Sequence, residues 1–551
     1  MMNRILKPAG AILYGREVLT HLPSELSLAG VRNPRIFTAP ENVRVARRIG
    51  RLLRSDRFPR WPVIHRDPPT DTDALIFLGG LPEAVKLVGG SWMTVFIPLS
   101  AGELEGLEES AFDCLILDRR FISDRDARTT GYFRRTALRL SGGLSSFPGT
   151  PELPPAFVYH NPTEIFSGHS SLEELPALFR EKLVRRPLII TDRGIAAAGI
   201  LDRLLEAVPG EMEPVIFQEV PPDSDSGVVN RISRIFREED RDVILALGGG
   251  SVLDTAKGVL MNVSLGGEDL LRYRGSGRLP RLEVPFIAVP TTSGTGSEST
   301  RVAVIAHEEE HRKMLFVSPF LQPDYGILDS RLTLSLPPHL TAMTGMDALS
   351  HAVEAFICLG RNPLSDQLAW TAVELIRDHL AEVTASPANQ EGRLALALAS
   401  NLAGQAFSNS MVGMVHTIGH SIGAVCRVPH GICMALLLPL GMEYNLKAAG
   451  PRLSLLLDAL EPSGSSGLKN GRERAERAVE AVRELNRKLN GLTGGRHPLR
   501  LRDWPTREGG PAVTPEDFDR IARTALGDGS IVYNPEELRY GDILKVLEQV
   551  Y

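Results

Sequence analysis

The chain has 551 residues, 43% hydrophobic and 23% charged, with a formal net charge of −6. It is too long for one compact domain, its composition is that of an ordinary globular protein, and its mildly acidic balance gives no reason to expect a nucleic-acid partner. Only four cysteines occur and none forms a C-x-x-C pair, which favours reduced thiols in a cytoplasmic protein over disulfides or a thiolate zinc site. We also expect no membrane partner, because no apolar run approaches the roughly 20 residues needed to span a bilayer.

The first 155 residues read as a degraded copy of the segment that follows. Three matches need no gap: residues 12–15 recur as 165–168, 22–23 as 175–176, and 35–38 as 188–191. Three more follow in the same order: 73–80 with 242–249, 95–103 with 287–298, and 113–118 with 324–329. Internal repetition resets the expected domain count. We predict a degenerate Rossmann-like α/β half-domain over 1–155.

This first copy lacks the residues that would hold a dinucleotide. Ala39 stands where Asp192 stands in the second copy, residues 79–82 replace a GGGS turn, and residues 99–102 replace a hydroxyl-rich loop. We therefore predict that it binds no dinucleotide. Its predicted role is to pack against the catalytic part or a partner subunit, because its strands need their apolar faces covered.

Between 156 and 336 the pattern predicts a Rossmann-like dinucleotide-binding domain. Apolar runs at 188–191, 243–247 and 286–289 are typical of buried parallel strands. Amphipathic stretches at 196–208 and 227–239 predict helices between them.

From 337 to 551 the sequence predicts an α-helical domain. Pro337 and Pro338 mark the boundary, because consecutive prolines interrupt regular structure. Long helical segments follow at 340–359 and 364–383, and the charged stretch 472–489 is interpreted as a solvated helix face.

Two glycine- and hydroxyl-rich turns each follow a predicted strand. In LALGGGSVLDTAKG (245–258), glycines allow close approach of a pyrophosphate and a helix N-terminus supplies N–H donors. In PTTSGTGSE (290–298), five hydroxyls and two glycines form a polar cradle suited to ribose and phosphate oxygens. A bare GGGS turn is also compatible with an ordinary strand–helix connection.

Histidines gather in the helical part. Asp347 and His351 are four residues apart, as are His416 and His420, and His430 lies in a Pro-His-Gly turn. Residues at this spacing share one helical face. A carboxylate with three imidazoles suits Fe²⁺ or Zn²⁺ and leaves a coordination position for substrate.

At these motifs the chain resembles the iron-containing (group III) alcohol dehydrogenase family, from about residue 160 to 551. GGGSVLDTAK, PTTSGTGSE, the stretch ending at 326–329, GMDALSHAVEAF and HTIGHSIGAVCRVPHG occur in family order and spacing. The resemblance implies a dehydroquinate synthase-like architecture: a Rossmann-like domain followed by an all-α metal-binding domain. It also implies NAD(P)-linked alcohol dehydrogenase or aldehyde reductase activity, a small alcohol or aldehyde substrate, and a homo-oligomer, commonly a dimer.

Residue by residue, the resemblance implies one divalent metal, Fe²⁺ before Zn²⁺, held by Asp347, His351, His416 and His430. His420 would lie near the nicotinamide, and we hypothesise that it relays a proton. Asp192 matches an acid that contacts the adenosine ribose in NAD-preferring members, so NAD is favoured over NADP. The remaining implied cofactor contacts are Gly249, Gly250, Ser251, Asp254, Thr291, Thr292, Thr295 and Lys313.

Two other functions stay open from the sequence. A dehydroquinate synthase-like lyase shares this fold and also uses NAD and a metal. A binding protein could retain the fold without activity. PTTSGTGSE and DALSHAVEAF favour the dehydrogenase branch, and the intact candidate ligands argue against a loss of activity.

Overall fold

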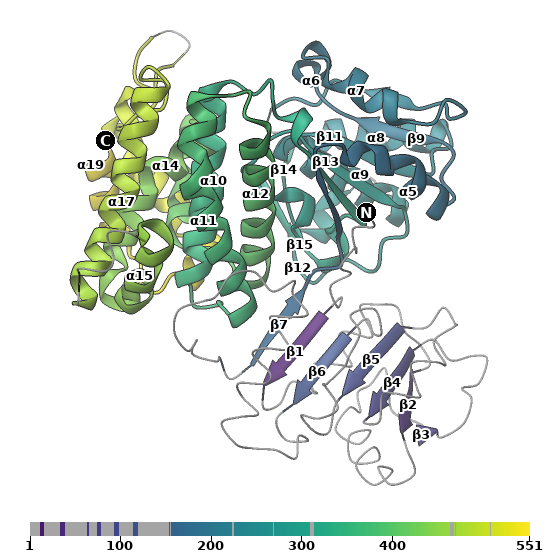
Figure 1. The fold of residues 1–551 in the computed structure, drawn as a ribbon, viewed down its shortest axis with the longest axis horizontal. Helices are drawn as coiled ribbons and strands as arrows, with labels where there is room; N and C mark the ends of the chain where they lie inside the picture. Colours follow the sequence, from purple (N-terminus) through teal and green to yellow (C-terminus); the bar gives the residue numbers. More distant parts are fainter. Residues whose placement is uncertain are drawn as a thin grey trace.

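The computed structural model describes residue 154 and residues 156–551, except 223–224, 268, 309–312, 463–467, 469 and 507–508, together with the backbone of six strands nearer the N-terminus. After residue 160 the chain forms a parallel sheet with helices against it, followed by a group of long helices (Figure 1). The predicted order, a Rossmann-like α/β part and then an all-helical part, is confirmed.

The sheet of the α/β part contains six strands whose neighbouring pairs are all parallel. In spatial order they are β10 (Val215–Phe217), β9 (Pro187–Ile190), β11 (Val243–Gly248), β13 (Phe286–Pro290), β16 (Tyr325–Asp329) and β8 (Glu164–Gly168). Every residue of β9, β11, β13 and β16 is buried. Continuous burial is the reason these strands read as unbroken apolar runs in the sequence.

Helices connect these strands: α5 (Leu175–Glu181), α6 (Arg193–Ala197), α7 (Ile200–Ala207), α8 (Ser226–Glu238) and α9 (Gly250–Leu265). The prediction of one helix over 196–208 is wrong. Gly199 has a φ of 70°, in the left-handed region that glycine reaches without strain, and it separates α6 from α7. A small sheet of β12 (Gly275–Ser276), β15 (Lys313–Val317) and β14 (Val302–Ala306) contacts α9 through β14.

The sheet topology brings the sequence motifs to one edge. β9, β11 and β13 are neighbours and run parallel, so their carboxyl ends lie side by side. Asp192 follows β9, the glycine turn follows β11, and the hydroxyl-rich loop follows β13. Ligands of open α/β sheets bind at such carboxyl ends.

The second part is helical, as the sequence predicts. Its first helix begins at Pro338, the second residue of the proline pair. The helices are α10 (Pro338–Ile357), α11 (Pro363–Ala385), α12 (Gln390–Ser410), α13 (Met414–Cys426), α14 (His430–Tyr444), α15 (Leu446–Leu460), α17 (Gly471–Leu492), α18 (Phe518–Ala525) and α19 (Tyr540–Val550). α12 packs on α10 and α11 and faces the α/β part (Figure 1). None of the described helices combines the length and apolar character needed to cross a bilayer.

The charged stretch 472–489 forms most of α17, but the prediction that it is only a solvated face is wrong. Ala478, Val482 and Leu489 are fully buried on the side that packs against α15. The apolar stripe of α17 consists mainly of small side chains that lie between many charged ones. The stripe is therefore not evident from the composition of this segment.

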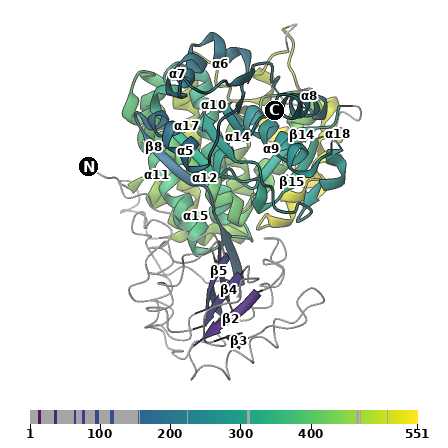
Figure 2. The ribbon, with the colours of Figure 1, turned by 90° about the vertical axis from the view of Figure 1, so that its right-hand side faces the viewer.

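A second sheet contains the six strands near the N-terminus and β7. Its spatial order is β3 (Val63–Ile64), β2 (Pro34–Thr38), β4 (Ala74–Leu78), β5 (Met93–Ile97), β6 (Cys114–Asp118), β1 (Ala11–Gly15) and β7 (Ala156–His160). Only β7 is antiparallel to its neighbour. The sheet lies at the end of the molecule opposite α6 and α7 (Figures 1 and 2).

The two larger sheets have the same strand order. β2, β4, β5, β6 and β1 contain the segments that match β9, β11, β13, β16 and β8 in sequence, and both sets follow that spatial order. The strand order therefore agrees with the proposed repeat. Ala39 and the turns at 79–82 and 99–102, on which the predicted loss of dinucleotide binding depends, lie outside the described residues.

Candidate metal centre and cofactor cradle

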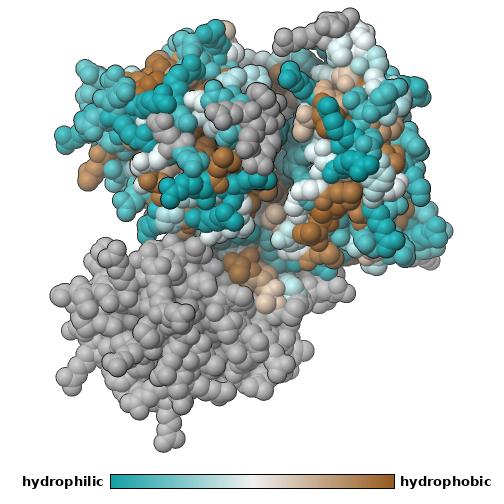
Figure 3. All heavy atoms as spheres, turned by 180° about the vertical axis from the view of Figure 1, so that it is seen from behind, coloured by the Kyte–Doolittle hydropathy of each residue, from teal (hydrophilic) through white to brown (hydrophobic). Residues whose placement is uncertain are grey.

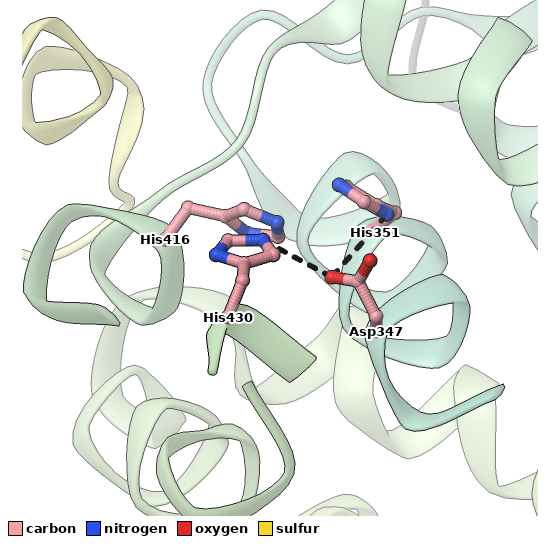
Figure 4. Close-up of side chains that lie close together, drawn as sticks. All are labelled: Asp347, His351, His416 and His430. Atoms are coloured by element: carbon pink, nitrogen blue, oxygen red, sulfur yellow. Dashed lines mark ion pairs between the residues drawn. The ribbon is translucent and has the colours of Figure 1, made fainter. Parts of the chain in front are cut away.

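Four predicted ligands converge from three helices (Figure 4). Asp347 and His351 are one turn apart on α10, His416 lies in the first turn of α13, and His430 begins α14. Each offers one ligand atom, and these atoms all lie within 4.8 Å of one another. Asp347, His351 and His416 are buried and His430 is partly exposed. These are the four residues that the family resemblance implies as metal ligands.

The atoms at the centre of this cluster are unsatisfied. Asp347 Oδ1, His351 Nδ1 and His416 Nε2 are buried and have no hydrogen-bond partner among the described residues. Asp347 Oδ1 lies 3.2 Å from His430 Nε2 and 3.9 Å from His351 Nδ1, close enough for electrostatic attraction without the geometry of a hydrogen bond. Buried polar atoms nearly always have partners. A divalent cation among these atoms would satisfy them together.

The electrostatics favour the protonation states that a metal requires. Burial lowers the pKa of His351 to about 3 and that of His416 well below its usual value, so both rings are neutral at pH 7. Burial alone would raise the pKa of Asp347, but the neighbouring His351 and His430 outweigh it and hold that pKa well below its usual range. Metal ligation needs neutral imidazole and ionised carboxylate.

His420 lies beside the cluster but is not part of it. Its ring stacks on His430 at 5.3 Å between centroids and meets His416 edge-on at 5.6 Å. Its Nδ1 lies 2.9 Å from Oδ2 of Asp528, whose other oxygen accepts a hydrogen bond from the backbone of Ser530. The His420 side chain is 37% exposed, as is that of His430, so both rings reach solvent while Asp347, His351 and His416 are buried.

The two predicted cofactor loops contact each other. Gly249 is the N-cap of α9 and has no side chain, so no side chain caps the first turn of this helix. A Cβ on Gly249 would lie 3.3 Å from Thr292, and a Cβ on Gly250 would lie 2.8 Å from Thr295. The glycines therefore allow the hydroxyl-rich loop to lie directly over the start of α9.

The hydroxyl-rich loop also reaches the helical part. A Cβ on Gly294 would lie 2.9 Å from Thr344, which precedes Asp347 on α10 by three residues. Gly296 has a φ of 59° and donates to Ser400 Oγ of α12. The same loop thus lies against the start of α9 and beside the helix that carries two of the predicted ligands. From behind, the surface is hollowed between the α/β and helical parts (Figure 3).

Two motif residues turn inward to hold this loop. Asp254 accepts from Ser297 Oγ and from the backbone N of Val304, so both its carboxylate oxygens have protein partners. Lys257 is fully buried and its Nζ donates to Ser297 Oγ and to both oxygens of Thr300. Asp254 thus supports the loop, and its predicted contact with the cofactor stays a prediction.

The other predicted cofactor residues lie around the same sheet edge. The Asp192 carboxylate caps α6 by accepting from the backbone N of Gly194 and Ile195. Arg193 pairs with Glu219 at 2.7 Å. Thr291 is buried and its Oγ1 has no hydrogen-bond partner among the described residues. Ser251 is exposed in the first turn of α9, and Lys313 is exposed at the start of β15.

Sequence reasoning missed two carboxylates that contact the histidines. Glu354 contacts His416, and it lies three residues after His351 on α10, a spacing that could have identified it. Asp528 is 108 residues from His420, so no local spacing could have indicated it.

Comparisons with known proteins agree with this geometry. The family model of iron-containing alcohol dehydrogenases matches residues 162–330, and the model of that family's C-terminal part matches residues 341–551. Alcohol dehydrogenase 4 of Saccharomyces cerevisiae is 30% identical over 394 residues, which are 71% of this chain and 98% of that protein. The 1,3-propanediol dehydrogenase of Klebsiella pneumoniae is 35% identical over 370 residues, which are 67% of this chain and 92% of that protein.

Solved structures give the same result. The crystal structure of a 1,3-propanediol oxidoreductase superposes with a TM-score of 0.67 at 33% identity, covering 72% of this chain and all of that one (100%). An alcohol dehydrogenase from Oenococcus oeni also gives a TM-score of 0.67 at 33% identity, covering 71% of this chain and 99% of that one.

Proposed function

The chain belongs to the iron-containing alcohol dehydrogenase family, and from this we propose that the cluster on α10, α13 and α14 is its catalytic centre. The reaction is metal-dependent, NAD(P)-linked oxidoreduction between alcohols and aldehydes. The observation that carries the assignment of the centre is the set of buried, unsatisfied atoms on Asp347, His351 and His416. The relatives named above are dehydrogenases, so nothing favours the lyase alternative.

We assign Asp347, His351, His416 and His430 as the metal ligands. Fe²⁺ is the metal of the family, and Zn²⁺ suits the same oxygen and nitrogen donors. When bound, the metal supplies a Lewis acid for the substrate oxygen. Burial of three of the four ligands keeps water away from this centre.

We place the dinucleotide at the carboxyl ends of β9, β11 and β13. The uncapped first turn of α9 offers N–H donors for a pyrophosphate, and the hydroxyls of Thr292 and Thr295 lie beside that turn. The bound nicotinamide supplies or accepts the hydride. Asp192 would repel a 2′-phosphate, which favours NAD over NADP.

His420 is the residue we assign to proton relay. Because Asp528 holds its Nδ1, the Nε2 atom is the one that can exchange a proton with a substrate oxygen. Its partial exposure gives that proton a route to solvent. If His420→Ala leaves the rate and its pH profile unchanged, this role is wrong.

The chain carries six further strands before residue 156, and we propose that this segment is a copy of the dinucleotide domain that binds no dinucleotide. The identical strand order of the two sheets supports the repeat. Titration of the full chain with NADH should then give one site per chain, and two sites would contradict the proposal. We also propose a homodimer in the cytoplasm; the free Cys358, Cys426 and Cys433 fit a reducing compartment.

The test of the central proposal is NADH oxidation by the purified chain against a panel of small aldehydes, with and without added Fe²⁺ or Zn²⁺. The matched control is the Asp347→Ala/His351→Ala double variant. Metal-dependent turnover that the control abolishes would support the assignment and begin to define the substrate. Failure of the chain to bind either NADH or metal would overturn it.

A further inference from the structure

Glu354 connects two helices of the metal centre from a buried position. It lies on α10, three residues after His351 and seven after Asp347, and its side chain is 2% exposed. Its Oε1 accepts from the backbone N of Val415 at 2.8 Å, and its Oε2 lies 2.5 Å from His416 Nδ1. Both contacts are to the first turn of α13.

The first of these contacts caps a helix. Gly413 is the N-cap of α13 and has no side chain, so the free N–H groups of the first turn need partners from elsewhere. Glu354 accepts hydrogen bonds from the backbone N–H groups of Val415 and His416. Asn534 Oδ1 accepts one from the backbone N–H of Met414 at 3.1 Å. A negative charge at a helix N-terminus is also favoured by the helix dipole.

The second contact selects the tautomer of His416. Burial raises the pKa of Glu354 to about 7, so the carboxylate is ionised above that pH. An ionised carboxylate oxygen only accepts, and the ring nitrogen 2.5 Å from it then carries the proton. The proton on Nδ1 leaves Nε2 with a free lone pair. That Nε2 atom is buried and has no hydrogen-bond partner among the described residues. The ring is thus held with its basic nitrogen toward Asp347 and His430.

We propose that Glu354 is a positioning residue of the metal centre, which fixes the orientation and tautomer of His416 so that Nε2 faces the metal. The inference rests on the proposed function, because it assumes that His416 is a ligand. Carboxylates that hold ligating histidines in this way typically contribute 10- to 100-fold to metal affinity.

Glu354→Gln tests this role with little change in shape. A glutamine has one acceptor oxygen and one NH₂ group, so it cannot replace both Oε1, which accepts from the backbone N of Val415, and Oε2, which faces His416 Nδ1. Asn534→Ala is the matched control, since it removes a cap from the same helix without touching His416. The readout is the affinity of the metal-free full chain for Zn²⁺ alone, measured by calorimetry, with folding checked by circular dichroism.

The expected result is a loss of about 10- to 100-fold in Zn²⁺ affinity for Glu354→Gln and less than about 3-fold for Asn534→Ala. Equal losses of Zn²⁺ affinity in both variants would show that the effect comes from the start of α13, and would overturn the proposal. An unchanged Zn²⁺ affinity in Glu354→Gln would also overturn it. If the unaltered chain bound no Zn²⁺, the proposed metal centre itself would fail.

A second measurement does not depend on the Glu354→Gln variant. Nitrogen-15 NMR of the metal-free, histidine-labelled chain distinguishes a protonated Nδ1 from a protonated Nε2, with assignment by a His416→Gln variant. Protonation on Nδ1 is expected. A proton on Nε2 would overturn the proposal.

Discussion

Nδ1 of His420 lies 2.9 Å from Oδ2 of Asp528, so a carboxylate from the segment between α18 and α19 holds a histidine beside the metal centre. Asp528→Asn keeps the shape of this side chain and removes its charge. We expect kcat to fall by at least about 10-fold, because the ring loses the partner that fixes its proton on Nδ1. KM for NADH and metal content should not change. Asp519→Asn, in an exposed ion pair with Arg523, is the control.

Metal removal should destabilise the helical part. The four ligands come from α10, α13 and α14, and without a cation their buried carboxylate and imidazole atoms lack partners. A ligand present at 100 times its Kd stabilises a protein by about 2.7 kcal/mol. Scanning calorimetry should therefore show a lower Tm after chelation and recovery on adding Fe²⁺ or Zn²⁺. The Asp347→Ala/His351→Ala variant should not respond to either treatment, and a metal-dependent Tm in that variant would contradict the ligand set.

Cofactor preference should depend on Asp192. Its carboxylate caps α6, and a serine can keep this cap while removing the charge. We expect Asp192→Ser to raise the ratio of kcat/KM for NADPH to that for NADH by about 10-fold, equivalent to about 1.4 kcal/mol. The neighbouring Arg193, which is paired with Glu219, would then face a 2′-phosphate without the Asp192 carboxylate. An unchanged ratio would show that Asp192 does not determine the preference for NADH over NADPH.

Acid should unfold the chain partly through His497. This ring is fully buried, bonds Asn486 Oδ1 at 2.9 Å through Nε2, and has a pKa lowered to about 4 by burial. Between pH 6.5 and 4 the unfolded chain binds a proton that the folded chain does not, so this contribution to stability is lost as pH falls. From pH 6.5 to pH 5 the loss is about 1.6 kcal/mol.

His497→Gln removes this titration and can still donate to Asn486. Its stability should fall less steeply than that of the unaltered chain between pH 6.5 and 5, as measured by urea unfolding at a series of pH values. Parallel curves for the two proteins would show that His497 does not carry this proton linkage.

The sequence predicts local features of this fold well and remote contacts poorly. The buried strands were visible because parallel strands covered on both faces are continuous apolar runs, and the ligand pair on α10 because one helical turn brings residues four apart together. The break at Gly199 and the buried stripe of α17 were missed, since they depend on a backbone angle and on packing against α15. Asp528 could not be found, because its contact with His420 exists only in the folded chain.

Deleting residues 1–154 should change how the chain associates without removing its chemistry. β7 pairs antiparallel with β1 from Ala156 to His160, while its side chains reach α12 through the bond of Tyr159 to Gln405. The deletion would leave β7 attached to the helical part with its former β1 edge unpaired. Exposed strand edges promote pairing with other chains. All assigned metal and cofactor residues follow residue 160, so binding of NADH and metal should persist.

We therefore expect the deleted chain to elute as larger or more heterogeneous species in size-exclusion chromatography with light scattering. Leu13→Pro in the full chain is the matched variant, because proline removes a backbone donor within β1, which lies between β6 and β7. The Leu13→Pro variant should also form larger or more heterogeneous species, but to a smaller extent than the deleted chain. A deleted chain that is fully active and has the oligomeric state of the full chain would show that the first unit does not protect β7, and the packing role would have to be given up.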